Sequence, residues 1–208
     1  MVEHILLVDF HHKYGPRIEY IYPSLNNNLS QSWEEIPFIC LPDGSHKVSE
    51  GFVYFRLSDR EPTTIYGVAS FRQIDVKDLL YIPEDVTRNY VQKSVCLLSK
   101  KPLYGYLTEK LKTVSFALFQ QKDFSSIGLL KDCYKEINSE VISDSLECLE
   151  SRVYEGLSFR HLVKTLKDKL LVLFKLLLLQ KRIFCTSSST RDLSLSIVSL
   201  VSLLPGTF

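Results

Sequence analysis

The first 142 residues combine short apolar runs of strand period with longer apolar stripes of helical period. Runs rich in β-branched and aromatic residues predict five strands, at residues 4–10, 17–22, 52–57, 64–72 and 91–101. The first and fifth runs are apolar on both faces, which is typical of inner strands. Turn-forming segments join the first strand to the second and the third to the fourth, so we expect two antiparallel hairpins.

Two amphipathic helices are predicted after the fifth strand. Pro102 ends that strand, so we expect the helix over 103–121 to fold back across the sheet. Its apolar positions are spaced by four and three and form one buried face, made of Leu103, Leu107, Leu111, Val114 and Leu118. Residues 127–141 repeat this pattern. A shorter helix is predicted at 33–41, which Pro37 is expected to end or kink.

The last third of the chain has a different character. Residues 143–158 are rich in serine and lack an apolar period, so we interpret them as a linker. Ser158 is expected to cap a helix over 159–180, whose second half is apolar nearly all round and therefore predicted to be buried on several sides. A strand at 182–186 and a helix at 192–204 follow. Because a lone strand leaves its backbone unpaired, we expect that the chain is cut short or that absent residues complete a second sheet.

Composition and charge narrow the function classes. The 208 residues carry a net charge of +1, so no global field favours nucleic acid. Residues 1–158 hold 17 Lys and Arg against 22 Asp and Glu, whereas residues 159–208 hold 8 against 2, which suggests two units or a local basic surface. The five cysteines lack zinc-ligand spacing and are interpreted as buried apolar side chains in a reducing compartment. No signal peptide is recognised, and the apolar run 170–179 is shorter than the ~20 residues of a membrane span.

Candidate chemistry in the first half of the chain is sparse. His11, His12 and Lys13 occupy the turn of the first hairpin, where a metal or catalytic role would need a further ligand or nucleophile that the sequence does not offer. We therefore interpret them as turn residues or partner contacts. The segment 43–46 lacks the GxSxG pattern of a hydrolase. Neither a Walker motif nor GxGxxG occurs, so no catalytic residue, cofactor or metal is assigned.

Four basic residues lie roughly along one side of the helix predicted over 159–180, namely Arg160, Lys164, Lys167 and Lys175. The plain interpretation is a solvated helix face. The alternative is an electrostatic surface for an acidic partner or an anionic membrane, to which each basic residue would contribute ~1 kcal/mol. Tyr104 and Tyr106 are expected to pack at the corner between the fifth strand and the helix that follows it.

Several short motifs, in order along the chain, resemble one known family. They are His11–Lys13, Leu41–Gly44, Phe71–Gln73, Val91–Cys96, Pro102–Gly105, Lys122–Ser125, Gly156–Ser158 and Leu203–Gly206. Over nearly its whole length the chain is thus similar to the Avl-nine late-secretory-pathway proteins of the wider DENN-domain group. The resemblance implies an α+β fold: a longin-like module of five antiparallel strands with packed helices in residues 1–142, a linker at 143–158, and the beginning of an α/β DENN lobe in residues 159–208.

The resemblance also implies a function. We expect a role in late secretory or endosomal transport, binding of a Rab-type GTPase, and activity as a guanine-nucleotide exchange factor. Exchange is differential binding to the nucleotide-free GTPase, so it needs a shaped surface and no nucleophile. Two alternatives stay open: a non-catalytic longin-like adaptor or scaffold, and a soluble hydrolase that uses His11 or His12. The expected location is cytoplasmic, with peripheral association to Golgi, endosomal or recycling membranes.

Overall fold

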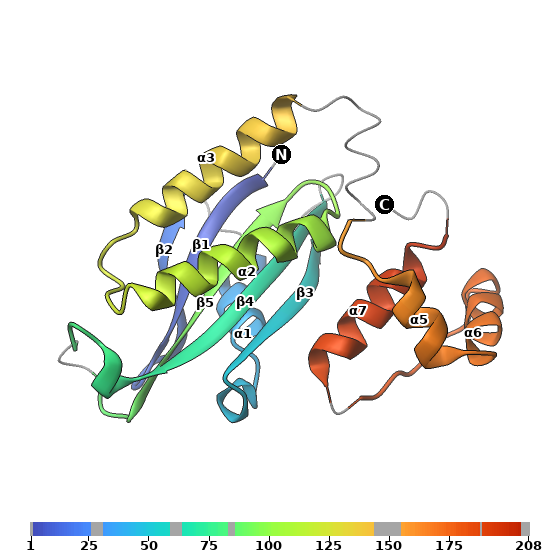
Figure 1. Ribbon diagram of the computed structural model, residues 1–208, viewed down its shortest axis with the longest axis horizontal. Helices are drawn as coiled ribbons and strands as arrows, with labels where there is room; N and C mark the ends of the chain where they lie inside the picture. Colours follow the sequence, from blue (N-terminus) through green and yellow to red (C-terminus); the bar gives the residue numbers. More distant parts are fainter. Residues whose placement is uncertain are drawn as a thin grey trace.

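Five strands form one sheet in the computed structural model, which describes residues 2–25, 31–58, 64–82, 86–143, 155–187 and 189–204 (Figure 1). The strands are β1 (Val2–His11), β2 (Gly15–Tyr22), β3 (Glu50–Ser58), β4 (Thr64–Asp75) and β5 (Tyr90–Ser99). Their order across the sheet is β2-β1-β5-β4-β3, and every neighbouring pair is antiparallel. The predicted five-stranded antiparallel layer is therefore confirmed, with β1 and β5 among its inner strands.

The strand β5 lies in the middle of the sheet because both of its faces are apolar. Val95 and Leu97 point into one core cluster, Cys96 and Leu98 point into the other, and all four are fully buried. Its two neighbours supply a ladder of backbone hydrogen bonds on each side, so the polar groups of the buried strand are satisfied.

Two helices cover one face of the sheet, α2 (Tyr104–Gln120) and α3 (Gly128–Ser143) (Figure 1). The predicted apolar face of α2 is confirmed, since its leucines are buried against the sheet and Val114 packs beside them. In α3 the fully buried positions are Leu130 and Ile137, seven residues apart and therefore on one side of the helix.

The opposite face of the sheet is covered by α1 (Gln31–Cys40). The helix predicted at 33–41 is confirmed as α1, and Pro37 lies inside it, so this proline does not end the helix. Proline removes one helical hydrogen bond. The burial of Trp33, Ile36 and Cys40 on one side of α1 outweighs that loss. Short 3-10 turns, η1 (Ser45–Lys47) and η2 (Val76–Asp78), follow α1 and β4.

The described residues after 155 form three helices, α5 (Phe159–Leu166), α6 (Lys169–Leu178) and α7 (Thr190–Val201). Ser158 caps α5 as predicted, because its Oγ accepts a hydrogen bond from the His161 N–H at 3.2 Å. The single helix predicted over 159–180 is wrong. Lys167, with φ of 47°, turns the chain between α5 and α6, and neither proline nor glycine marks this position in the sequence.

Two further predictions fail in this part of the chain. Residues 182–186 belong to no strand, because every strand of the described residues lies in the first sheet and the segment has no partner to pair with. The helix α6, which was expected to be buried on several sides, has no buried residue. Of the predicted linker, residues 144–154 lie outside the described residues.

The second part of the chain meets the first at a pair of glycines. A Cβ atom on Gly105, in the first turn of α2, would coincide with the carbonyl oxygen of Glu155. Gly156 has a φ of +74°, which glycine adopts without steric cost. Beyond this contact, α7 lies beside β3, and Val198 packs against the core of the sheet (Figure 1).

Candidate functional site

The structure places His11, His12 and Lys13 at the turn between β1 and β2, as predicted. The Nδ1 atom of His11 accepts hydrogen bonds from the backbone N–H groups of Lys13 at 3.1 Å and Tyr14 at 3.2 Å. The Nδ1 atom of His12 accepts from the N–H groups of Thr87 at 2.7 Å and of the following residue at 3.2 Å. Both rings satisfy backbone donors, one within the turn and one in the loop before β5, which is a structural role.

Near this turn, a row of charged residues runs across all five strands of the sheet. It holds one residue from each strand, in the order Glu50, Arg72, Lys93, Asp9 and Arg17, and each is directly opposite the next. Directly opposite residues of antiparallel strands project from the same face. These five residues, named the charged row, therefore share the face that α2 covers.

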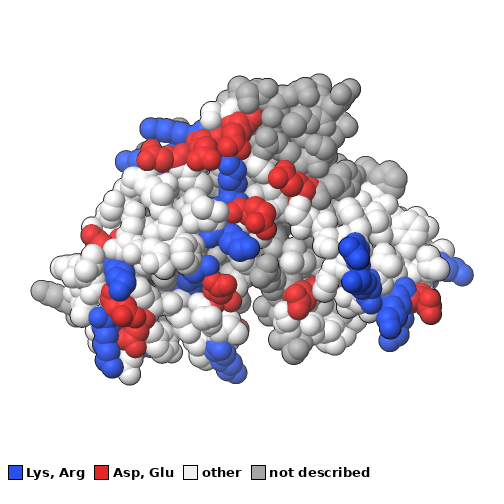
Figure 2. Space-filling model, in the orientation of Figure 1, with Lys and Arg blue, Asp and Glu red and all other residues white. Residues whose placement is uncertain are grey.

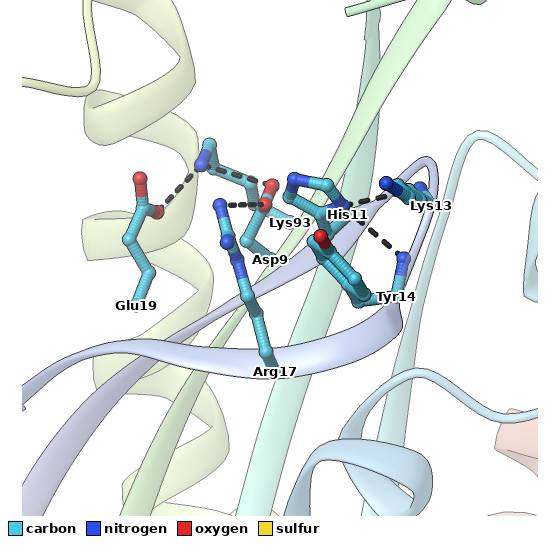
Figure 3. A network of polar contacts seen from close by, with 7 residues as sticks. All are labelled: Asp9, His11, Lys13, Tyr14, Arg17, Glu19 and Lys93. Atoms are coloured by element: carbon cyan, nitrogen blue, oxygen red, sulfur yellow. Dashed lines mark hydrogen bonds and ion pairs between the residues drawn. The ribbon is translucent and has the colours of Figure 1, made fainter. Parts of the chain in front are cut away.

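Ion pairs join three members of the charged row, Lys93, Asp9 and Arg17 (Figure 3), and the other two members form a separate pair. Lys93 Nζ lies 3.1 Å from Asp9 Oδ1, and the Arg17 guanidinium lies 3.6 Å from the other oxygen, Oδ2. Arg72 pairs with Glu50 at the other end of the row. The Lys93 side chain is 7% exposed and that of Asp9 is 13% exposed. Removing one partner of such a buried ion pair leaves the charge of the other uncompensated, so each side chain depends on its partner to remain buried.

Glu19 joins this network through an irregularity in β2. The pairing register shifts between Leu7 and Val8 of β1, and Glu19 is the residue of β2 that is skipped. A bulge of this kind redirects a side chain. Glu19 Oε2 reaches Lys93 Nζ at 2.5 Å, so the ammonium group lies between two carboxylates (Figure 3).

Aromatic rings from α2 and the loop after it lie over the charged row. The ring of Phe116 is 5.4 Å from the Arg72 guanidinium, and the ring of Phe124 is 5.2 Å from Lys93 Nζ. A hollow of about 200 Å³ opens beside Lys93, and a second of about 400 Å³ opens beside Arg72. The row therefore lines two depressions on the surface.

Large apolar side chains stand at the rim of the smaller hollow. Leu80, Tyr81 and Ile82 are 77%, 65% and 50% exposed, and Tyr81 lines the hollow itself. The Leu80 N–H donates to the carbonyl of Lys122 at 2.9 Å, which ties this loop to the end of α2. Single exposed apolar residues are ordinary, but a contiguous group beside a hollow that also holds charged side chains is typical of an interaction site. Residues 80–82 are named the apolar rim.

The residues of this hollow are suited to binding a partner molecule and not to covalent catalysis. The Lys93 ammonium is engaged by two carboxylates, so it is not poised as a nucleophile. Hydrogen bonds from the backbone N–H and then the hydroxyl of Ser125 lower the pKa of Asp123, so this half-buried carboxylate stays charged at neutral pH. Across the described ranges, no group of His, Cys, Asp and Glu could hold a metal ion.

The other candidates in the first part of the chain are packing residues. Ser45 is buried, and its Oγ accepts a hydrogen bond from Gln92 Nε2 at 2.8 Å, so the only hydroxyl of segment 43–46 is engaged in the core. Tyr104 and Tyr106 are buried at the start of α2, as predicted. Burial raises the pKa of the Tyr104 hydroxyl to about 12.

The four basic residues predicted along one helix are divided by the break between α5 and α6. Arg160 and Lys164 lie on α5, Lys167 lies at the turn, and Lys175 lies on α6. All four are exposed, but they form no continuous stripe on one helix. Within the part of the chain that the structure describes, no helix is both long and apolar enough to cross a membrane.

The charged row was not predicted from the sequence, although the sequence holds one signal for it. Lys93 stands at strand period between Val91 and Val95, which belong to the face of β5 predicted to be buried. A charge at an inward-facing position implies a charged partner. The partners come from strands whose register the sequence does not state, and the side of Glu19 depends on a bulge.

Comparisons with known proteins identify the family of this chain. The family model described as "Transport protein Avl9" matches residues 2–208. The chain is 34% identical over 223 residues to "Late secretory pathway protein AVL9" of Saccharomyces cerevisiae, an alignment that covers 97% of this chain and 29% of the relative. It is 33% identical over 199 residues to "Late secretory pathway protein avl9" of Schizosaccharomyces pombe, covering 95% of this chain and 41% of that relative. The chain thus spans less than half the length of these relatives, and it belongs to the Avl9 transport-protein family.

Proposed function

We propose that the protein acts in membrane transport along the late secretory pathway, the role that the names of its two yeast relatives state of them. The family match over residues 2–208 carries this proposal. In the same proposal, the five-stranded unit is a longin-like module and residues 159–208 begin a DENN lobe. The protein associates peripherally with the cytoplasmic side of Golgi, endosomal or recycling membranes.

The molecular activity in this proposal is binding of a Rab-type small GTPase at the hollow beside Lys93. Protein interfaces combine an apolar centre with polar groups around it, and a few large side chains carry most of the affinity. The apolar rim supplies Tyr81 and Leu80, which are exposed. Three members of the charged row, Asp9, Arg17 and Lys93, supply polar groups in the hollow next to them, together with Asp123.

Binding becomes nucleotide exchange when the surface fits the nucleotide-free GTPase better than the loaded one. Side chains held by several ion pairs favour this, because they lose little conformational freedom when a partner docks. Lys93 and Asp9 are held in this way. The mobile switch regions of the GTPase then adapt to the rigid surface and loosen the nucleotide.

Nucleotide release tests both parts of the proposal. A panel of Rab proteins is loaded with a fluorescent GDP analogue and mixed with the 208-residue chain or with the double variant Leu80→Asp, Tyr81→Ala. Both residues are largely exposed, so we expect the variant to fold normally. The matched control is Phe38→Asp, which changes a side chain that is 61% exposed on α1, on the opposite face of the sheet.

The expected result is that the parent chain and the control bind one or a few GTPases and accelerate release. The rim variant should lose roughly tenfold or more in affinity, as hot-spot residues do. Binding without faster release favours the adaptor or scaffold alternative. Failure of the parent chain to bind any member of the panel would refute the GTPase proposal, and unchanged binding by the rim variant would remove the hollow as its site.

A further inference from the structure

The hollow beside Lys93 contains three Asp and Glu side chains against two of Lys and Arg. The carboxylates are those of Asp9, Glu19 and Asp123, and the cations are Lys93 and Arg17. Asp9 lies within ion-pair distance of both cations, and Glu19 also binds Lys93. Asp123 forms no ion pair with any residue that the structure describes. The hollow therefore holds one negative charge that the described part of the chain does not pair.

Local hydrogen bonds hold the Asp123 carboxylate in place. The Ser125 N–H donates to Asp123 Oδ1 and the Ser125 hydroxyl donates to Oδ2, both at 2.9 Å. Each oxygen of an ionised carboxylate has two lone pairs, so both oxygens keep one for an incoming donor. Because the side chain is already fixed and half-buried, it loses little conformational freedom when a donor binds to it.

The hollow lies away from the second part of the chain. Residues 155–204 meet the first part at Gly105, in the first turn of α2, whereas Asp123 and Phe124 follow its last turn. The 17 residues of α2 separate these two places by about 25 Å. In Figure 2 red and blue side chains stand together at the end of the molecule where η2 lies, whereas blue ones predominate where α5 and α6 lie. The contact with the second part of the chain thus leaves the hollow open.

We propose that this hollow receives a lysine or arginine side chain of the GTPase, and that Asp123 is the residue that selects it. This inference rests on the GTPase binding proposed above. Tyr81 is 65% exposed and lines the same hollow, so its ring covers the aliphatic stem of the incoming residue and attracts its charge. Residues 1–158 hold 17 Lys and Arg against 22 Asp and Glu, and this excess of negative charge favours the approach of a basic surface.

An acidic or a purely apolar group fits the hollow less well. Lys93 is engaged by two carboxylates and its side chain is 7% exposed, so it is not available to an incoming carboxylate. The Arg17 guanidinium lies 3.6 Å from Asp9 Oδ2 and is engaged as well. An incoming carboxylate would instead be repelled by Asp123. An apolar group would bury the Asp123 charge without a partner, which is unfavourable.

A double-mutant cycle tests the proposal with the 208-residue chain and a GTPase that it binds in the nucleotide-release panel. In the chain, Asp123→Asn removes the charge but keeps the size and an acceptor for the Ser125 N–H. The matched control is Asp43→Asn, the same charge change at an exposed position in the turn before η1. In the GTPase, each exposed lysine and arginine is replaced by alanine in turn, and the Kd of every combination is measured.

We expect Asp123→Asn to weaken binding roughly tenfold, the smallest coupling that close charge pairs across an interface show, and Asp43→Asn to leave the Kd unchanged. Replacing one basic residue of the GTPase should cost a similar factor against the parent chain and nothing further against Asp123→Asn. Added salt should weaken binding of the parent chain more steeply than binding of Asp123→Asn, because salt screens the pair.

Three outcomes would overturn this inference while GTPase binding itself stands. The first is a Kd unchanged by Asp123→Asn, and the second is a loss that adds to that of every basic residue replaced in the GTPase. The third is an affinity of the parent chain that does not fall with added salt, a measurement that needs no variant and holds even where Asp123→Asn folds poorly. A parent chain that binds no GTPase of the panel removes the proposed function and this inference with it.

Discussion

Replacing Lys93 with methionine measures how far the charged row stabilises the fold. The ammonium group lies 3.1 Å from Asp9 and 2.5 Å from Glu19, and its side chain is 7% exposed. Methionine keeps an unbranched apolar side chain under the ring of Phe124 but removes the charge. The substitution therefore leaves two carboxylates close together with their shared cation gone.

The loss in the free energy of unfolding depends on the contacts and the exposure that Asp9 and Glu19 keep once the Lys93 ammonium is gone. Removing one partner of a buried ion pair costs about 3–5 kcal/mol. Two features lower this value here: Asp9 keeps its contact with Arg17, and the Glu19 side chain is 36% exposed to water. We expect a loss of about 2–3 kcal/mol in the free energy of unfolding, or a fall in Tm of about 5–10 °C for a chain of this size.

Urea unfolding followed by circular dichroism is the assay, and Lys110→Met is the matched control. Lys110 also bridges two carboxylates, Glu136 at 2.9 Å and Glu140 at 2.7 Å, but its side chain is 26% exposed on the helical surface. Such a pair is worth about 1 kcal/mol or less. If Lys93→Met is as stable as the parent, or loses no more than Lys110→Met, the charged row does not stabilise the fold and the reasoning fails.

Three further predictions concern stability, thiol reactivity and pH. Gly105→Ala should lower the free energy of unfolding in urea by about 1–3 kcal/mol, because the new Cβ would meet the backbone of Glu155, which cannot move aside as a side chain can. A decrease below about 0.5 kcal/mol would contradict this contact. After brief alkylation at neutral pH, mass spectrometry should find Cys185 labelled before the buried thiols of Cys40, Cys96 and Cys133. Burial raises the pKa of Cys96 and of Cys133, so little of the reactive thiolate forms there. Early labelling of any of these three buried cysteines would refute their burial in the core. Asp123→Ala should be less stable than the parent at pH 7, because the hydrogen bonds from Ser125 stabilise the charged form of the Asp123 carboxyl. The difference in the free energy of unfolding should vanish as the pH falls through the lowered pKa of this carboxyl. A difference that persists at low pH would show that these hydrogen bonds are not its cause.

Much of the first part of the fold follows from local patterns. The strand and helix periods locate all five strands, α2 and α3, because each element buries one face against the same sheet. Pro37 does not end α1, since the burial of Trp33 and Ile36 keeps the chain helical beyond the proline. The break at Lys167 has no sequence signal at all.

The candidate site could be predicted only in part. His11 and His12 are assigned correctly to a turn because Gly15 and Pro16 mark that turn in the sequence. The hydrogen bonds that His12 accepts from backbone N–H groups depend on the loop before β5, which is about 75 residues away along the chain. The apolar rim stands in a segment that looks irregular in sequence, and only the folded chain shows that it borders a hollow containing the charged side chains of Asp9, Arg17 and Lys93.

The sequence by itself determined that an antiparallel sheet with amphipathic helices packed on it would form, since the spacing of apolar residues sets which side of each element must leave water. The tertiary structure alone decided which charges meet. Strand register brought Asp9, Lys93 and Arg17 into one line, and a bulge added Glu19. The physical reason is that ion pairs depend on the distance between side chains in space, and positions far apart in sequence acquire that distance only when the strands pair.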